Sequence, residues 1–379
     1  MSPRRSEQGF ALPITLFVVA LVTVMLATAF VRVRNDYRIS DSSGDMVDAF
    51  AVAQAGLSTY MAQVAFDECD NAIRPADGHS QRFNVPGGYA DVVAHVAYRP
   101  ADTLAPWTYV IRSTGNLIRP ASGADPQAVR TVAQFAQWQY GSIEMLAAIT
   151  SASGLDRYPD GSCPAAPDGD GCGQFTGTDQ NYKVACRLPN IPAIRVPSGK
   201  DMLESLDYFT VSGSAVESGT KESVAQETNI DWPRTITGGI VPDEYGVRVW
   251  DSSYPVQFVA GDATIDCAPE TWGWGLLVVT GDLTIQGTKG ATAMGRGCLQ
   301  WNGVVIVGGR IHFLSDDQRF DGLVISGMAW QIGTDVKRTK YGGNYIDIDF
   351  DSYEVRKALA PLAGFAPIGN AWVDNWSTY

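Results

Sequence analysis

The sequence predicts an α+β fold: a long N-terminal helix packed on an antiparallel sheet, followed by a large β-rich C-terminal domain of the solenoid or β-helix type. Three observations carry this prediction. An uncharged apolar run from Phe10 to Val31 leads into an amphipathic stripe. Three later segments alternate between apolar and polar residues, and four segments near the C-terminus repeat a strand–glycine–strand pattern.

Charge, histidine content and the missing motifs argue against several classes of protein. The 379 residues include 28 Lys and Arg against 41 Asp and Glu, so the net charge is −13. A chain this acidic is a poor partner for nucleic acid. Only three histidines are present, which leaves few residues for acid–base catalysis or metal binding. The sequence has no P-loop, no dinucleotide-binding fingerprint and no G-x-S-x-G motif. We therefore expect neither an enzyme nor a cofactor.

The first element is a helix over residues 10–66. It begins with the uncharged run FALPITLFVVALVTVMLATAFV, which is long enough to cross a membrane. Arg4 and Arg5 are expected to hold its start on the cytoplasmic side. Further along, apolar residues such as Phe50 and Leu57 recur at three- and four-residue spacing. We expect this stripe to pack on the protein's own sheet.

The start of the chain resembles a known processing signal. Basic and polar residues precede Gly9, and the apolar run begins at Phe10 in the motif RRSEQGFALPITL. This motif is similar to the class III signal of type IV pilins and pseudopilins. The resemblance implies a leader over residues 1–9, cleavage between Gly9 and Phe10 by prepilin peptidase, and methylation of the new terminus. A plain signal anchor is the alternative.

Ile14 departs from the pattern of the major subunits in that family. Major pilins carry glutamate as the fifth mature residue, where it neutralises the terminal amine of a neighbouring subunit, because a buried unpaired amine is costly. Loss of this glutamate marks large minor subunits of the PilX/GspK-like class, and Ala51–Met61, AVAQAGLSTYM, resembles a segment of the same class. The resemblance implies a minor, tip-proximal subunit with Phe10 and Ile14 at the assembly surface and other minor and major pilins as partners.

Residues 67–141 are expected to form a pilin-like β-sheet domain. Gly88–Tyr98, Trp107–Ser113 and Val129–Trp138 alternate in polarity and end near turn residues. This pattern favours an antiparallel sheet laid on the preceding helix. The segment Tyr109–Gly115, YVIRSTG, resembles part of the sheet in PilX-like proteins.

Residues 251–379 are expected to form the β-solenoid-like domain, after a loop-rich insertion with cysteines over residues 142–250. The repeated segments are VQFVAGDATI, LLVVTGDLTI, VVIVGGRIHF and LVISGMAWQI. Their aligned glycines are Gly261, Gly281, Gly308 and Gly327. A period near 20 residues, with one longer step of 27, predicts stacked coils with glycine at a corner. An antiparallel sandwich is the alternative.

Six cysteines are consistent with disulfides in an exported protein. The candidates are Cys267, Cys298, Cys163, Cys172, Cys186 and Cys69. Cys267 and Cys298 flank neighbouring repeats, so we expect a bridge between them. One bridge is expected among the three cysteines of residues 163–186, which leaves the third available to Cys69. The sequence leaves the connectivity open.

Two groups of carboxylates are candidates for a ligand site. Asp168 and Asp170 lie in the glycine-rich segment PDGDGCG and are weak candidates for Ca²⁺, although a solvated turn is the favoured interpretation. Asp347, Asp349 and Asp351 alternate in IDIDFD, which puts them on one strand face. That row suits a cation or a sugar, and the favoured interpretation is an edge strand protected by charge. No metal is expected.

These observations lead to a minor pilin or pseudopilin that primes assembly of a type IV pilus or related filament and presents a large C-terminal head. We expect it in the inner membrane with a cytoplasmic N-terminus before assembly, and afterwards in an extracellular filament or a periplasmic pseudopilus. Three alternatives remain open. They are a pilus-borne adhesin for glycans, a type II secretion pseudopilin, and a β-helix enzyme that acts on polysaccharide through Asp347, Asp349 and Asp351.

Overall fold

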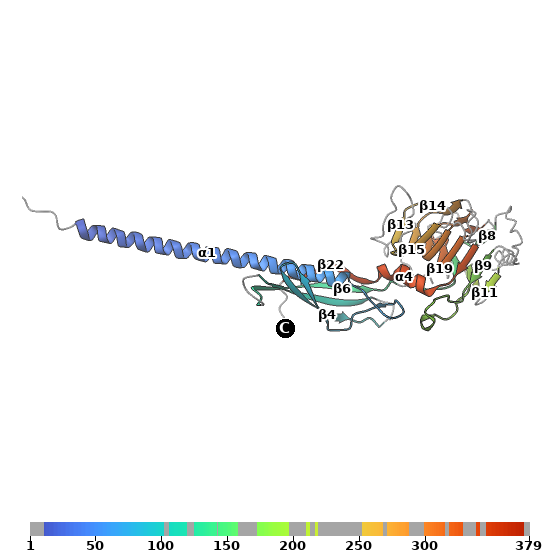
Figure 1. Ribbon diagram of the computed structural model, residues 1–379, viewed down its shortest axis with the longest axis horizontal. Coiled ribbons are helices and arrows are strands. Elements are labelled where there is room, and N and C mark those ends of the chain that lie inside the picture. The colour runs from blue at the N-terminus through green and yellow to red at the C-terminus, as the bar shows by residue number, and fades with distance from the viewer. Residues whose placement is uncertain are drawn as a thin grey trace, which may run out of the picture. The chain divides into compact units, whose positions relative to one another are not determined.

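The fold is α+β, with one long apolar helix at the N-terminus and a β-rich remainder (Figure 1). The computed structural model describes residues 11–101, 106–119, 125–141, 143–157, 173–196, 210–212, 217–218, 252–267, 271–287, 299–314, 318–328, 339–341 and 346–374. The chain divides into two compact units. Unit 1 comprises Met1–Gln63, Pro75–Gln137 and Phe365–Tyr379, and unit 2 comprises Val64–Arg74 and Trp138–Gly364.

Helix α1 of unit 1 spans Ala11–Ala62, 52 residues without interruption (Figure 1). The side chains of residues 13–44 are all exposed, and the helix becomes buried only in its last turns, through Ala49, Val52, Ala53, Leu57 and Tyr60. The change follows the sequence, because the apolar stripe with three- and four-residue spacing begins only there.

The helix ends before residue 66, where we expected its end. Ala65–Phe66 forms strand β1, which pairs antiparallel with β2, Ala72–Ile73. The carboxylate of Asp67 accepts the backbone N–H groups of Cys69 and Asn71 at 2.8 and 2.9 Å. This local bonding stabilises a turn that competes with continued helix.

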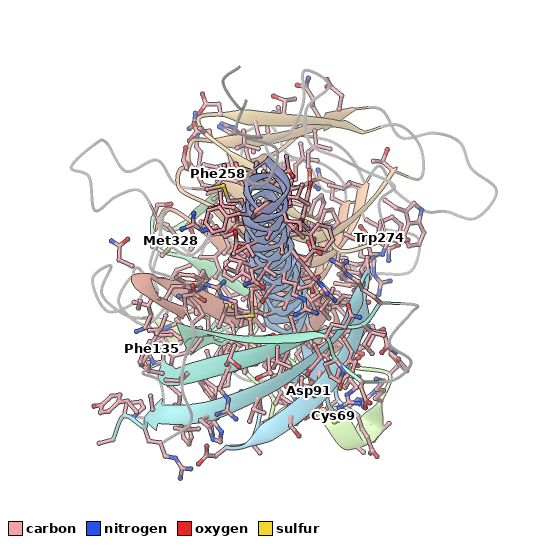
Figure 2. All side chains as sticks on the ribbon, turned by 90° about the vertical axis from the view of Figure 1, so that its left-hand side faces the viewer. Cys69, Asp91, Phe135, Phe258, Trp274 and Met328 are labelled. Carbon is pink, nitrogen blue, oxygen red and sulfur yellow. A yellow bond between two sulfur atoms is a disulfide. The ribbon has the colours of Figure 1, made fainter. Side chains whose placement is uncertain are left out.

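The helix of unit 1 packs on a five-stranded sheet with the order β22-β6-β5-β4-β3. Its strands are β3 His79–Val85, β4 Gly88–Tyr98, β5 Trp107–Leu117, β6 Ala128–Gln139 and β22 Gly364–Asp374. The pairs β3–β4 and β4–β5 are antiparallel. Across the first pair, Arg82 Nε donates to Asp91 Oδ1 at 2.6 Å, and Figure 2 labels Asp91.

Small residues allow α1 to approach this sheet closely. A Cβ atom added to Gly115 would lie 2.2 Å from the carbonyl oxygen of Ala49, and one added to Gly56 would lie 2.2 Å from the Cβ of Ala90. The hydroxyl of Ser113 donates to the carbonyl of Ala53 at 2.7 Å. Larger side chains at the two glycines would push the helix away from β4 and β5.

Unit 2 consists mostly of short strands. They are β7 Ile149–Ser151, β8 Leu155–Arg157, β9 Gly173–Thr176, β10 Ile194–Val196, β11 Thr210–Ser212, β12 Glu217–Ser218, β13 Val256–Val259, β14 Ala263–Cys267, β15 Thr271–Val279, β16 Leu283–Gly287, β17 Leu299–Val307, β18 Ile311–Phe313, β19 Gln318–Ser326, β20 Thr339–Tyr341 and β21 Ile346–Asp349. Among the described residues of this unit, the α-helix is α4, Ser352–Leu359, and the 3₁₀ turns are η1, Val184–Cys186, and η3, Ala360–Leu362.

The strands of unit 2, apart from the β1–β2 hairpin, pair in parallel in two sheets. One has ten strands on the path β11-β9-β21-β19-β17-β15-β13, with β7, β10 and β12 attached, and the other has the order β14-β16-β18-β20-β8. The two sheets advance together: Val279 pairs with Val307 in one, and Leu283 pairs with Ile311 in the other, both 28 residues on. Five passes of the chain therefore add one strand to each sheet: β13 with β14, β15 with β16, β17 with β18, β19 with β20, and β7 with β8.

A glycine column divides the long strands of the larger sheet. Gly275 pairs with Gly303 and Gly303 with Gly322, and all three have positive φ, at 96°, 133° and 143°. Residues other than glycine adopt this conformation only with strain. On either side of Gly322, the two halves of β19 have different partners opposite β17, because the first half pairs with β21 and the second half with β7.

A second glycine column differs by one residue from the expected one. The N–H of Gly281 donates to the carbonyl of Gly261, that of Gly309 to Gly281, and that of Gly327 to Gly309, at 2.8, 2.8 and 2.7 Å. Gly309, rather than Gly308, therefore continues the column, because the strands pair with a step of 28 residues and not 27.

The repeat also has a member that the sequence analysis did not include. Strand β7 pairs with β19 and β8 pairs with β20, so Ile149–Arg157 continues both sheets beyond the fourth copy. These strands are three residues long and come from the region expected to be a loop-rich insertion. The stack therefore uses residues from both sides of that boundary.

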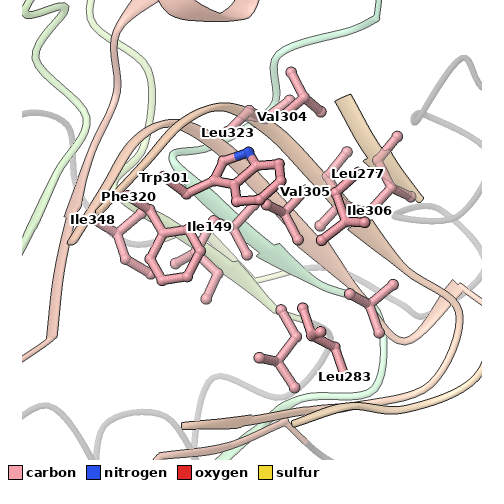
Figure 3. Close-up of a cluster of buried hydrophobic side chains, with 14 of the residues drawn as sticks. Ile149, Leu277, Leu283, Trp301, Val304, Val305, Ile306, Phe320, Leu323 and Ile348 are labelled. Carbon is pink, nitrogen blue, oxygen red and sulfur yellow. The ribbon is translucent and has the colours of Figure 1, made fainter. Parts of the chain in front are cut away.

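The core of unit 2 is formed by apolar residues from both sheets. Figure 3 shows part of it, with Trp301, Phe320 and Ile348 beside aliphatic side chains of β15, β17 and β19. The indole N–H of Trp301 donates to the carbonyl of Gly275 at 3.2 Å, which satisfies its polar atom inside the core.

The division into units differs from the expected one at residues 141 and 251. The last strand, β22, belongs to the sheet of unit 1, although we assigned residues 251–379 to one domain. Phe365 explains this, because its ring lies 5.9 Å from that of Tyr60 and 5.2 Å from that of Tyr109. Gln134 Nε2 also donates to the carbonyls of Ile368 and Ala371.

Candidate functional site

The first candidate site is the exposed half of α1. Its helix is long and apolar enough to cross a membrane, with a mean hydropathy of 2.7 over the most apolar window and none of that window buried. Large apolar side chains such as Phe17, Leu26 and Phe30 are about two-thirds exposed, at 67%, 66% and 71%. Water disfavours an apolar surface of this extent, so the half-helix is suited to a lipid or protein environment.

Charged residues mark the end of the apolar half. Arg32, Arg34, Asp36 and Arg38 follow directly, and all four are exposed on the same continuous helix. Ile14 lies near the start of the apolar half and is 56% exposed. The processing residues Gly9 and Phe10 lie outside the described residues.

The other half of α1 is fixed by an aromatic cluster in unit 1. The hydroxyl of Tyr60 lies 2.9 Å from Nδ1 of His79, and its ring packs near Phe83 and Phe365. Burial, and then the neighbouring Tyr109, raise the pKa of Tyr60 to about 12. This tyrosine therefore stays neutral at physiological pH and acts as a packing group that holds the helix on its sheet.

The second candidate site contains the carboxylates of IDIDFD, and the expected edge strand is wrong. Strand β21 lies inside the larger sheet, between β19 and β9, and Asp347 and Asp349 are only 8% and 6% exposed. Asp351 has a separate role, because its side chain accepts the N–H groups of Tyr353 and Glu354 as the N-cap of α4. The three carboxylates therefore do not form one solvent-facing row.

Asp347 and Asp349 belong to a larger set of side chains on the face of the sheet opposite the core, in which Asn302 and Thr176 are also largely buried. Alternate residues of β17, β19 and β21, such as Trp301, Phe320 and Ile348, point into the core, so the residues between them lie on the opposite face. Strand register arranges those residues in two columns. The columns, together called the indole–carboxylate face, are Trp272, Gln300, Arg319, Asp347 and Gln174, and Trp274, Asn302, Asp321, Asp349 and Thr176.

Hydrogen bonds connect one end of this face. Gln300 Nε2 donates to Asp321 Oδ2 at 2.9 Å. The network assigns the amide of Asn302 so that its nitrogen donates to Asp321 and its oxygen accepts from Trp274 Nε1 at 3.0 Å. The indole of Trp274, which Figure 2 labels, is thereby fixed relative to two neighbouring strands.

Ion pairs connect the other end. Arg319 Nε donates to Asp321 Oδ1 at 2.9 Å, and its Nη2 donates to Asp349 Oδ2 at 3.4 Å. Gln174 Nε2 donates to the other oxygen of Asp349 at 3.4 Å. Oδ1 of Asp347 has no hydrogen-bond partner among the described residues, although it is buried.

Electrostatics set the protonation of this face. The pKa of Asp347 is raised to about 7, first by burial and then by the charge of Asp349, against the opposing charge of Arg319. Burial also raises the pKa of Asp349, which Arg319 opposes. With three carboxyl groups around one arginine and the pKa of Asp347 near 7, the face becomes more acidic as the pH rises through neutrality.

A disulfide joins Cys69 to Cys186 within unit 2. It ties the β1–β2 hairpin to η1, and Lys183 Nζ donates to Asp70 Oδ2 beside it at 2.5 Å. Arg356 of α4 donates to the carbonyls of both Cys69 and Cys186, at 3.2 and 3.1 Å. Figure 2 labels Cys69.

Most of the other candidate cysteines and both calcium candidates are not described by the structure. Cys267 closes β14, where its backbone pairs with Gly287. The remaining candidates, Cys163, Cys172, Cys298, Asp168 and Asp170, lie outside the described residues. Within the part of the chain that the structure describes, no group of three or more His, Cys, Asp or Glu residues is arranged to hold a metal ion.

Most residues of the indole–carboxylate face were not predicted from the sequence, in which only Asp347 and Asp349 stood out as candidates. The segments WGWG, LQWN and QRFDG repeat the same alternation of inward and outward residues and could have indicated the others.

Comparison of the chain with protein-family models, curated proteins and solved structures finds no significant match.

Proposed function

We propose that the chain is a minor subunit of a type IV pilus or related filament, with α1 as its assembly helix and unit 2 as its head. The observation that carries the proposal is the division of one continuous helix into an exposed apolar half and a half packed on the protein's own sheet. Such a helix transfers from lipid to a bundle of like helices without refolding. A simple anchor needs no 52-residue helix that continues beneath a sheet.

The proposal includes removal of the leader, residues 1–9, before assembly. Prepilin peptidase removes residues 1–9 at the cytoplasmic side of the inner membrane, and Phe10 becomes the methylated first residue. The motif RRSEQGFALPITL and the uninterrupted helix from Ala11 support this step. The mature subunit then leaves the membrane to join other minor and major pilins.

Ile14 supports a position at the filament tip. An isoleucine has no carboxylate to neutralise the terminal amine of a neighbouring subunit, and that amine would be costly to bury unpaired. A tip subunit has no neighbour ahead of it and needs no such pair. The size of unit 2 supports the same position, because a large head is hard to repeat along a shaft.

The head itself we assign to the β-solenoid class. Support comes from two parallel sheets that advance together and from glycines that recur at matching positions of successive passes. Such a head has a rigid outer face on which side chains of successive passes lie in columns.

The mature N-terminus tests the processing step. Mass spectrometry of the membrane-extracted protein is expected to find Phe10 as a methylated first residue. Gly9→Val is expected to retain the leader, whereas Ser6→Ala, a change within the leader but away from the cleaved bond, should be processed normally. A mature chain that begins at any other residue would refute the prepilin assignment.

The position in the filament needs a separate test. Immunogold labelling of unit 2 is expected at filament ends, and labelling along the whole shaft would contradict a tip role. With Ile14→Glu we expect some label within the shaft, because the new carboxylate can pair with a neighbour's terminal amine.

A type II secretion pseudopilin is the second candidate, because the same helix argument applies to it. Loss of the gene would then abolish protein secretion and leave surface filaments unchanged, the reverse of the result expected for a pilus subunit. The polysaccharide-active enzyme has less support, since Asp347, Asp349 and Asp351 do not form the open row that it required.

A further inference from the structure

The indole–carboxylate face combines features that a filament subunit does not need for assembly. It lies in unit 2, away in sequence from α1, and its side chains come from β9, β15, β17, β19 and β21. At one end, the rings of Trp272 and Trp274 stack with centroids 5.7 Å apart and planes 16° apart. Both tryptophans are only half-buried, although tryptophan is a residue that folding usually covers.

We propose that this face binds a neutral oligosaccharide. The paired indoles supply flat apolar surface for the C–H faces of sugar rings. Beside them, the partly exposed side chains of Gln300, Arg319 and Gln174 present amide and guanidinium groups for vicinal hydroxyls. Asn302 and Asp321 are largely buried and hold Trp274, Gln300 and Arg319 in position. The proposal concerns ligand binding by unit 2, goes beyond the filament role and does not depend on it.

The polar groups are already held in place before any ligand arrives. Asn302 connects Trp274 to Asp321, and Arg319 connects Asp321 to Asp349. A preorganised site loses less side-chain entropy on binding. Asp347, in the same column, is only 8% exposed and its Oδ1 is buried, so this carboxylate contributes to the charge of the face and not to direct contact with a ligand.

The length of the indole–carboxylate face also suits a chain of sugars. Neighbouring strands lie about 4.8 Å apart, so five strands span roughly 19 Å from the tryptophans to Gln174. The columns run straight across the strands, because each pair is in register. A linear oligosaccharide laid across the strands would contact the aromatic and polar parts together.

Charge and geometry disfavour two other ligand classes, polyanions and divalent cations. Asp321, Asp347 and Asp349 outnumber Arg319, so a uronate-rich polysaccharide or other polyanion would be repelled. A divalent cation is disfavoured, because the described residues hold no group of three ligands in a suitable arrangement. A neutral glycan satisfies both conditions.

The test uses the full-length protein in detergent micelles on an array of neutral, amine-bearing and uronate oligosaccharides. We expect binding to neutral oligomers, with affinity lowered about tenfold or more by Trp272→Ala and by Trp274→Ala. Trp272→Phe and Trp274→Phe keep a flat ring and should retain most of the binding. Trp372→Ala is the matched control, since Trp372 is 40% exposed and lies in unit 1.

Thermal unfolding of each variant separates loss of binding from loss of fold. If an alanine variant unfolds, Gln300→Ala replaces it as the test, with binding weaker by about threefold to tenfold. Absence of any glycan binding by the wild type overturns the proposal, as does binding that survives both tryptophan-to-alanine changes. A preference for uronate or amine-bearing oligomers overturns the assignment of a neutral ligand.

Discussion

At the residue scale, Gly115 decides how closely helix α1 approaches its sheet. A Cβ atom there would lie 2.2 Å from the carbonyl oxygen of Ala49 and 2.4 Å from the backbone nitrogen of Ala53. Neither is a flexible side-chain atom, so the helix itself must move. We expect Gly115→Ala to lower the free energy of unfolding by roughly 1–3 kcal/mol, measured by urea unfolding of the full-length protein in micelles.

Gly44 provides the matched control in the same helix. Nothing lies within 4 Å of the Cβ atom that an alanine would add, and alanine is the better helix former. Gly44→Ala should therefore raise the free energy of unfolding by up to about 1 kcal/mol. Equal urea midpoints for Gly115→Ala and the wild type would mean that the close contact between α1 and the sheet at Gly115 does not contribute to stability.

Asp347 makes stability depend on pH. Its pKa is about 7 in the folded chain, whereas an ordinary aspartate has a pKa of 3.8. Between these values the folded chain binds a proton that the unfolded chain has lost, so the free energy of unfolding falls as pH rises from about 4 to 7. Asparagine has no charge to lose. Asp347→Asn should thus be more stable than the wild type at pH 8 by about 1–3 kcal/mol, and no more stable near pH 4.

Urea unfolding at a series of pH values measures this difference. Asp91→Asn serves as the comparison, because Asp91 is an exposed carboxylate paired with Arg82. A constant gap between Asp347→Asn and the wild type from pH 4 to 8 would contradict the raised pKa.

At the scale of elements, the β1–β2 hairpin is held by a covalent bond. The Cys69–Cys186 disulfide joins residues 117 apart in sequence, which restricts the unfolded chain over a long loop. We expect the double variant Cys69→Ser, Cys186→Ser to lose about 2–5 kcal/mol in free energy of unfolding. Urea unfolding without reductant measures the loss, and an unchanged midpoint would show that Lys183 and Arg356 hold the hairpin without the bond.

The sequence identified elements where local pattern and burial agree. Strands β4 and β6 alternate over a full strand length, and the end of α1 carries a clear apolar stripe, so periodicity was sufficient. Strands β7 and β8 are too short to show a period. Strand β22 contains glycine and proline in APIGNAW and forms only because β6 offers an edge far earlier in the chain.

The candidate sites were likewise predictable only where the local sequence pattern was sufficient. The apolar run and Ile14 could be identified from the sequence, because hydropathy and residue type do not depend on tertiary contacts. Alternation placed Asp347 and Asp349 on one face correctly, but it did not indicate that neighbouring strands flank and bury them. Trp274, Asn302 and Asp321 are aligned because their strands pair in parallel. The number of residues between paired positions differs from one pair of strands to the next, so the alignment could not be predicted from a fixed repeat length.

At the scale of the whole molecule, the chain passes four times between the two units. The crossings follow Gln63, Arg74, Gln137 and Gly364. Unit 2 is therefore not a terminal extension. The greater part of it lies between β6 and β22, two strands that are neighbours in the sheet of unit 1.

Truncation tests this arrangement. A chain that ends at Leu362 lacks β22, so it exposes the edge of β6 and removes Phe365 from Tyr60 and Tyr109. Exposed edges pair with other chains, and we expect self-association detected by light scattering of the protein in micelles. A chain that ends at Asp374 keeps β22 and should behave as the full-length protein. Monodisperse behaviour of the shorter chain would show that β22 is dispensable.

The late position of β22 sets an order of assembly within a single molecule. Proteins are synthesised from the N-terminus, so β6 waits with an open edge while all of Trp138–Gly364 is made. The sheet beneath α1 therefore receives its edge strand β22 only after the whole of that span has been synthesised. A chain interrupted anywhere in the span lacks β22 and leaves this edge of β6 without its partner strand.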